Sequence, residues 1–320
     1  FAPRCKYATE KCRQEEPALE KIEEDRHKSN ASELLTKDLC NYINNNNNHK
    51  YSEEFRTYCL SVSVKCMDSK TLENLIEKLP NDIDWCDYEN DNFAYLFYRC
   101  ASKINDGISE SNSKTREFVN NVFNKGIGYL ISNSFAPESF KNKSNVYKLG
   151  YLKSICTIAS KKLTNLENIS EISQKISKIK CEDLGTDQKV LLTYAKIPGE
   201  QQKTEGIKAL KAITGDVKSV EDFEKFLNDE RKLGKEELGK EVLLQLARIP
   251  HDSEEQLSAL KAIIGKRKFG DFLNDEKELG KEVLLQLARI PHDDTEQLSA
   301  LKAIIGKRKF GDFLNDEKEL

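Results

Sequence analysis

Apolar residues recur every three or four positions along most of this chain, the spacing of a helix with one buried face. Positions 149, 152, 156, 159 and 163 follow this spacing, and residues 169–179 repeat it. We expect these two segments to pair as a helical hairpin joined at residues 165–168. No stretch of useful length alternates apolar and polar residues as a half-buried strand does. The pattern therefore predicts an all-α protein.

The C-terminal part of the chain is a tandem repeat. Residues 238–278 and 279–319 are copies with a period of 41 residues, and they differ only where Ser253 and Glu254 become Asp294 and Thr295. Residues 184–237 contain a looser copy of the same pattern. Periods of this length are typical of stacked helical units. We therefore predict a helical domain followed by a short α-solenoid of about three units.

Each copy divides into three short helices, as the last copy illustrates. Its first helix, over residues 281–289, ends before Pro291 because the residue before a proline is disfavoured in the α region. Asp293 then has the position of an N-cap, with Glu296 completing a capping box. The second helix ends at Gly306 and a third helix follows. The second helix is expected to bury Leu298, Leu301 and Ile305.

Three pieces of the chain differ in composition. Residues 1–29 form a short segment rich in Cys and Glu, residues 30–183 an Asn- and Ser-rich helical domain, and residues 184–320 the repeat region. Such unlike pieces, with near-identical copies and a start other than Met, also suit an artificial or chimeric sequence without a defined function. Recent natural duplication explains the copies equally well. Stacked units normally carry a polar capping unit, whereas the chain ends one residue into a further copy. We therefore expect that the C-terminal repeat self-associates, packs back on the middle domain or belongs to a fragment.

The charge balance narrows the choice of partner. The chain has 51 Lys and Arg against 54 Asp and Glu, a net charge of −3, so no global field attracts nucleic acid or an anionic membrane. No apolar run approaches the roughly 20 residues of a membrane span, and the first 30 residues lack the apolar core of a secretory signal. We expect a protein partner of unknown identity, no membrane span and no nucleic acid.

The nine cysteines favour a reducing compartment, and hence a cytoplasmic protein. They are too sparse in 320 residues for a disulfide scaffold, and several lie in the apolar stripe of a predicted helix. The counter-evidence is three Asn-x-Ser triplets, the acceptor sequence for N-glycosylation of secreted proteins. They begin at Asn30, Asn142 and Asn168. Such triplets arise readily by chance in a chain rich in Asn and Ser.

The first 17 residues, FAPRCKYATEKCRQEEP, contain a recognisable spacing of Cys, Arg, Glu and Pro. Residues 1–30 resemble the Cys-containing C-terminal tail of the ATPase subunits of oligopeptide and dipeptide ABC transporters. The matching residues are Phe1, Arg4, Cys5, Cys12, Glu15 and Pro17. In some members four cysteines bind an iron–sulfur cluster, so the resemblance implies an iron–sulfur or zinc site at Cys5 and Cys12. Here Ala31 stands near the place of the last cysteine, and two thiolates do not complete a four-ligand cluster.

Two features recur at equivalent positions of the near-identical copies, residues 238–278 and 279–319. Basic triplets follow the glycine that ends the second helix, where positive charge is favourable, so helix capping accounts for them. The triplets are Lys266, Arg267 and Lys268 in one copy and Lys307, Arg308 and Lys309 in the next. His251 and His292 each follow a proline, and one histidine per copy is too few for a metal site. These eight residues are our candidate ridge for binding a protein partner.

The motifs of catalysis are missing from the sequence. It contains no nucleophile elbow, zinc-protease helix, kinase signature or dinucleotide fingerprint. Residues 234–241, GKEELGKE, approach a phosphate-binding loop, but Glu241 replaces the required Ser or Thr. We interpret the chain as a non-enzymatic scaffold that binds a protein and has no cofactor. The alternative is a metal-containing accessory segment associated with peptide ABC transport.

Overall fold

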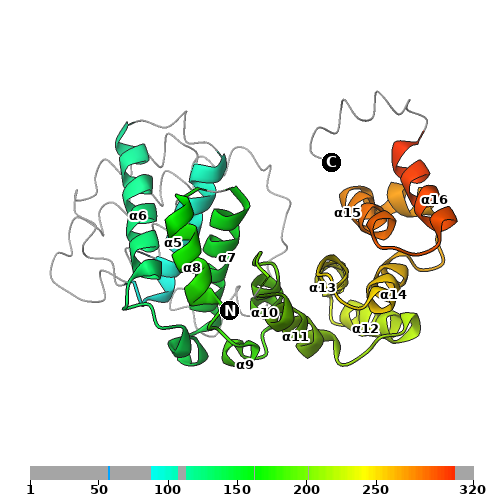
Figure 1. The fold of residues 1–320 in the computed structure, drawn as a ribbon, viewed down its shortest axis with the longest axis horizontal. Helices are drawn as coiled ribbons and strands as arrows, with labels where there is room; N and C mark the ends of the chain where they lie inside the picture. Colours follow the sequence, from blue (N-terminus) through cyan, green and yellow to red (C-terminus); the bar gives the residue numbers. More distant parts are fainter. Residues whose placement is uncertain (1–56, 58–87, 107–112, 162, 201, 307–320) are drawn as a thin grey trace, which may run out of the picture.

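The structure, a computed structural model, describes residues 57, 88–106, 113–161, 163–200 and 202–306. Within these ranges every regular element is a helix, which confirms the predicted all-α class (Figure 1). The elements are α5 (Asp91–Asp106), α6 (Ser113–Ile131), the 3-10 helix η2 (Pro137–Asn142), α7 (Asn145–Lys161), α8 (Leu166–Ile176), α9 (Cys181–Leu184), α10 (Gln188–Ala195), α11 (Gln202–Thr214), α12 (Val220–Lys232), α13 (Glu236–Arg248), α14 (Ser253–Ile264), α15 (Phe269–Arg289) and α16 (Asp294–Ile305). Among these helices, none has the length and apolar character needed to cross a membrane.

Helices α5 to α8 form a bundle around an aromatic core. Phe97 on α5 and Tyr151 on α7 are completely buried, with ring centroids 5.9 Å apart. Helices α5 and α7 approach closely because α7 carries Gly150, where a Cβ atom would lie 2.6 Å from the carbonyl carbon of Ala94. A glycine on one helix thus sets the distance between two helices.

The expected hairpin of α7 and α8 is only partly present. Asn165 joins the two helices as the N-cap of α8, and its side chain accepts a 2.8 Å hydrogen bond from the Asn168 amide. However, α8 packs more extensively against α6 than against α7. The spacing of apolar residues identifies the buried face of α8 but not the helix that covers this face.

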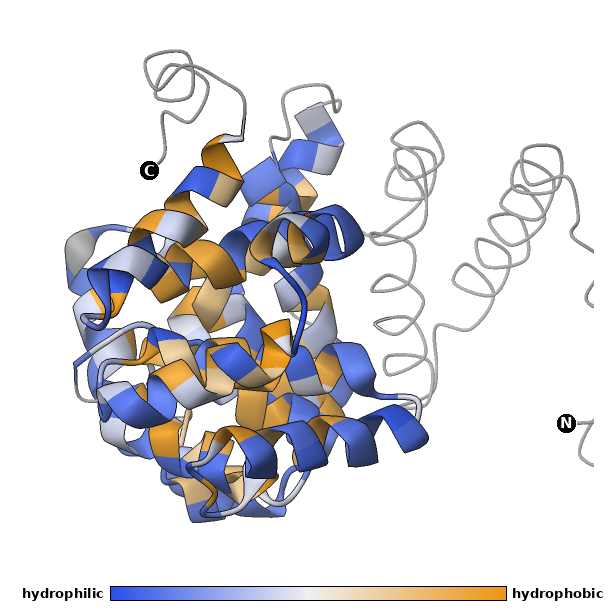
Figure 2. Ribbon diagram, turned by 90° about the vertical axis from the view of Figure 1, so that its right-hand side faces the viewer, coloured by the Kyte–Doolittle hydropathy of each residue, from blue (hydrophilic) through white to orange (hydrophobic). Residues whose placement is uncertain are grey.

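A second core runs through α10 to α16, which lead away from the bundle one after another (Figure 1). Hydrophobic residues gather on the facing sides of these helices, and hydrophilic residues lie outside (Figure 2). Helix α10 contributes to both cores: Leu191 and Tyr194 pack in the bundle, whereas Leu192 and Ala195 pack with the later helices. The two cores therefore meet at α10.

The local signals for helix ends are confirmed in the repeats. Asp252 and Asp293 are the N-caps of α14 and α16, and each side chain accepts hydrogen bonds from amides of the first turn. Gly265 and Gly306 end the same two helices at φ 65° and 63°, the left-handed conformation that glycine tolerates best. The expected capping box at Glu296 is wrong, because this carboxylate pairs with Lys261 of the preceding copy instead.

One prediction about the repeat helices is confirmed and another is wrong. The third helix of one copy and the first helix of the next are both present within the range of α15, and a kink at Lys277 (φ 38°) separates them. No glycine lies at this kink, whereas Gly234 (φ 69°) separates α12 from α13. Leu298 and Leu301 on α16 are 51% and 38% exposed rather than buried. The residue equivalent to Leu301, Leu260 on α14, is 0% exposed.

Candidate interaction surface

The contacts between successive copies recur from one junction to the next. We call residues 184–237 unit 1, residues 238–278 unit 2 and residues 279–319 unit 3. Lys196 of unit 1 forms an ion pair with Glu241 of unit 2. At the equivalent positions, Arg248 of unit 2 pairs with Glu282 of unit 3 at 2.8 Å. Both pairs join the last turn of one unit's first helix to the first helix of the next unit.

A second ion pair joins the second helices of successive units. Lys211 on α11 pairs with Glu255 on α14 at 3.0 Å, and Lys261 on α14 pairs with Glu296 on α16 at 3.1 Å. The lysines occupy equivalent positions, and so do the glutamates. The environments differ, since the Glu255 side chain is 1% exposed and that of Glu296 is 28% exposed. The carboxylate of this ion pair is therefore shielded from water at the first junction and partly hydrated at the second.

A glutamine makes the third repeated contact. The side-chain amide of Gln245 donates a 2.9 Å hydrogen bond to the Ala195 carbonyl, and that of Gln286 donates a 3.0 Å bond to the Ala247 carbonyl. Each glutamine reaches the C-terminal end of the preceding unit's first helix, where carbonyl groups lack intrahelical partners. Three kinds of contact thus relate unit 2 to unit 1 and unit 3 to unit 2.

The two candidate histidines are turned inward. Each Nδ1 lies 2.7 Å from a backbone carbonyl, of Ile249 for His251 and of Ile290 for His292. Since a carbonyl only accepts, Nδ1 carries the proton. Each Nε2 is buried and faces the glutamate of the inter-unit ion pair, at 3.8 Å in unit 2 and 3.4 Å in unit 3. The histidines therefore lie beneath the surface rather than on a ridge.

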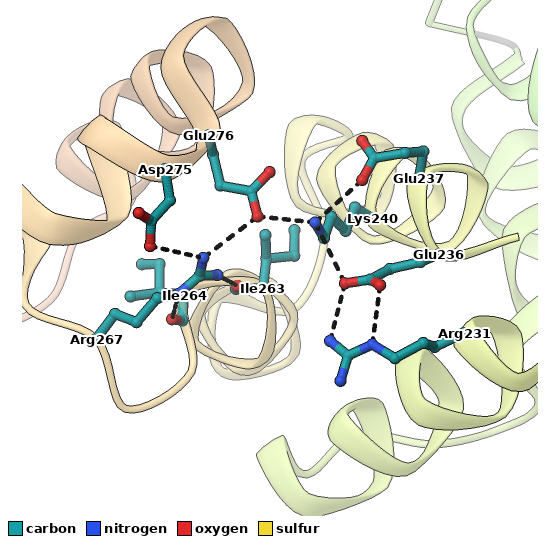
Figure 3. Close-up of polar contacts among 9 residues, drawn as sticks. All are labelled: Arg231, Glu236, Glu237, Lys240, Ile263, Ile264, Arg267, Asp275 and Glu276. Carbon is teal, nitrogen blue, oxygen red and sulfur yellow. Dashed lines mark hydrogen bonds and ion pairs between the residues drawn. The ribbon is translucent and has the colours of Figure 1, made fainter. Parts of the chain in front are cut away.

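Only part of the described basic triplet is available to a partner. The Arg267 guanidinium donates hydrogen bonds to the carbonyls of Ile263 and Ile264 at 2.8 and 3.0 Å (Figure 3). It also lies over the Phe272 ring. This arrangement confirms the capping role for Arg267. Lys266 and Lys268 on either side are exposed.

The remaining candidate residues lie outside the described residues. They are Cys5, Cys12, Lys307, Arg308 and Lys309.

A polar network that the sequence analysis missed crosses the junction of units 1 and 2 (Figure 3). Buried Lys240 reaches three carboxylates, those of Glu276 at 2.8 Å, Glu237 at 3.1 Å and Glu236 at 3.4 Å. Burial lowers the pKa of Lys240, but the hydrogen bonds to Glu276 and Glu237 outweigh it, so this pKa is raised overall. The equivalent residues of unit 1 also pair, since Gln188 donates a 2.9 Å hydrogen bond to Glu230. No local pattern in the sequence marks either pair.

Other candidate groups among the described residues lie apart from the unit junctions. No group of three or more His, Cys, Asp or Glu side chains within them is placed to hold a metal ion. A cavity of about 460 Å³ beside α6 is lined by Tyr88, Tyr129 and Lys125. The buried Lys148 ammonium donates a hydrogen bond to the Leu184 carbonyl, which assigns it a structural role.

Comparisons of the chain with family models, curated proteins and solved structures found no match.

Proposed function

We propose that the chain is a non-catalytic scaffold whose repeat region stacks as a short α-solenoid and binds a protein partner. The observation that supports this proposal is the recurrence of the same side-chain contacts at both junctions, above all Lys211–Glu255 and Lys261–Glu296. Repeated contacts impose a similar rotation and translation on each unit. Equivalent exposed residues then line up along one side of the stack, the arrangement by which repeat proteins build extended binding surfaces.

The proposed contact surface is the edge of the stack that carries Lys266 and Lys268. These side chains are exposed, whereas the arginine between them is held by backbone carbonyls. Two lysines held at a fixed spacing favour an acidic patch on the partner and accelerate encounter with it. Aspartates and glutamates follow the triplet closely, so a nucleic acid backbone fits this edge less well than a protein does.

Affinity capture followed by binding measurements tests the proposal. The full chain is immobilised, a captured protein is purified, and its affinity is measured by calorimetry. We expect the double variant Lys266→Glu, Lys268→Glu to weaken binding at least about tenfold. The matched control is Lys225→Glu, an exposed lysine on α12, which should leave the affinity unchanged. Turnover of a small molecule by the chain, or equal loss of affinity in both variants, would contradict the proposal.

A second candidate function rests on the N-terminal resemblance. Under this alternative, Cys5 and Cys12 hold an iron–sulfur cluster or zinc in a segment associated with peptide transport. Metal analysis and an absorbance spectrum of the purified chain distinguish the two proposals. A stoichiometric metal that is lost in Cys5→Ser would favour the second candidate. We place the scaffold in the cytoplasm, since Cys156 and Cys181 are free thiols.

A further inference from the structure

Helix α16 exposes an apolar stripe that includes Leu301, a position that is buried in units 1 and 2. Leu301 is 38% exposed, whereas its equivalents Leu210 and Leu260 in units 1 and 2 are 0% exposed. One turn earlier, Leu298 is 51% exposed. Residues spaced by three and four lie on one side of a helix, so the two leucines form one stripe. In units 1 and 2 the position of Leu301 is thus fully buried, and Leu257, the unit 2 equivalent of Leu298, is half-buried.

The same side of α16 carries unmatched charge. Lys302 is equivalent to Lys211 and Lys261, each of which pairs with a glutamate of the following unit. Among residues 88–106, 113–161, 163–200 and 202–306, Lys302 has no ion pair and its side chain is exposed. Asp294 at the other end of the helix is also exposed and lies four residues before Leu298. The stripe therefore has an acidic end, an apolar middle and a basic end.

The acidic end coincides with the only sequence changes between the clean copies. Unit 2 has Ser253 and Glu254 where unit 3 has Asp294 and Thr295. The two changes together keep the net charge and move the negative charge by one residue, about 100° around the helix. In unit 3 this shift brings the carboxylate onto the side of Leu298 and Leu301.

We propose that two copies of this chain associate through α16, with the two helices antiparallel about a two-fold axis. An antiparallel pair centred between residues 299 and 300 places Leu298 of one copy opposite Leu301 of the second copy. It also places Asp294 of each copy near Lys302 of the other, so two ion pairs form for one interface. A second copy fits because the stripe is complementary to itself, as an isologous interface requires.

The association is expected to be weak and concentration-dependent. One helix from each copy buries less than the about 800 Å² per partner of a standard interface, so we expect a dissociation constant in the micromolar range. This surface is distinct from the edge at Lys266 and Lys268, so its failure and the failure of the proposed partner binding are separate results.

Sedimentation velocity of the full chain between about 1 and 200 µM tests the dimer. We expect a monomer–dimer equilibrium that Leu298→Asp shifts toward monomer by at least about tenfold in dissociation constant, because a buried charge replaces an apolar contact. The control is Leu233→Asp in the turn between α12 and α13, since this leucine is also exposed. Circular dichroism establishes that both variants remain helical.

A charge exchange tests the orientation of the two helices. Lys302→Asp should weaken the dimer, and the same change combined with Asp294→Lys should restore association toward that of the wild type. A chain that remains monomeric at about 200 µM would overturn the proposal, and another segment or another protein would then be the occupant of this stripe. A dimer that Leu298→Asp leaves intact would also overturn it.

Discussion

Glu236 shows how one ion pair fixes the charge of a residue at a unit junction. Two hydrogen bonds from Arg231, each 2.8 Å long, lower the pKa of its carboxyl group from 4.5 to about 2, with a further contribution from Lys240. The folded chain therefore holds the charged form more firmly than the unfolded chain does. Glu236 stabilises the fold above about pH 4.5, and this contribution is lost as the pH falls toward 2.

We expect Glu236→Gln to lower the urea midpoint at neutral pH, because it removes the charge that Arg231 and Lys240 face. The difference from the wild type should shrink as the pH is lowered from 4.5, since the wild-type carboxyl group then gains its proton. Urea unfolding at a series of pH values measures this difference. The control is Glu221→Gln on α12, because this carboxylate is exposed and has no ion pair within the described residues. A difference that does not depend on pH would contradict the assignment.

Cys156 on α7 illustrates the opposite effect, in which burial keeps a group neutral. Burial raises the pKa of its thiol to about 12, against a smaller opposing effect of Lys196, and Sγ donates to the Thr193 carbonyl at 3.5 Å. Because the thiolate is the reactive form, we expect iodoacetamide at pH 8 to leave Cys156 unmodified in the folded chain. Peptide mass analysis should show labelling only after unfolding in urea, and rapid labelling of the native chain would refute this prediction.

At the scale of helices, Gly150 is expected to control the packing of α5 against α7. Alanine at this position would place its Cβ 2.6 Å from the carbonyl carbon of Ala94. The two helices would have to separate, at a cost of about 1–3 kcal/mol in the free energy of unfolding. Gly128 on α6 is the matched control, since no atom lies within 4 Å of the corresponding Cβ. Gly128→Ala should stabilise by up to about 1 kcal/mol. Urea unfolding of both variants measures the contrast, and equal destabilisation would contradict it.

Helix ends were predictable from the sequence because they depend on neighbouring residues along the chain. Asp252 and Asp293 are N-caps and Gly306 ends a helix, as expected from the residue types at these positions. Whether a stripe is covered depends on other elements, so the exposure of Leu298 and the packing of α8 on α6 were not predictable. The inward histidines were missed for the same reason, because a position after proline does not indicate which way a ring turns.

At the scale of the whole molecule, the candidate surface depends on how the units are joined. The 41-residue period of the near-identical copies predicts stacked helical units, but it does not indicate which residues join them. Lys211 and Glu255 are 44 residues apart, and only the packing of α11 against unit 2 brings them together. The network around Lys240 depends likewise on Glu276, 36 residues away. Such pairs follow from tertiary structure and leave no local signal.

The two equivalent ion pairs allow a test in which only burial differs. Lys211→Met leaves the almost completely buried carboxylate of Glu255 without its cation, and one oxygen of this carboxylate already lacks a hydrogen-bond partner. We expect the free energy of unfolding to fall by about 3 kcal/mol, as for other buried pairs that lose one partner. Lys261→Met should cost less than about 1 kcal/mol, because water reaches the carboxylate of Glu296. Methionine keeps the apolar stem of lysine in both variants.

Urea unfolding of the two single variants measures these costs, and a double-mutant cycle separates the pair from its surroundings. Adding Glu255→Gln to Lys211→Met should recover much of the lost stability, because the uncompensated charge disappears. The same addition at Glu296 should change little. If both lysine variants cost the same, burial at the first junction would not strengthen the contact between units. The stack would then owe its geometry to the apolar core that α10 to α16 share, and the ion pairs would select the register of units already in contact.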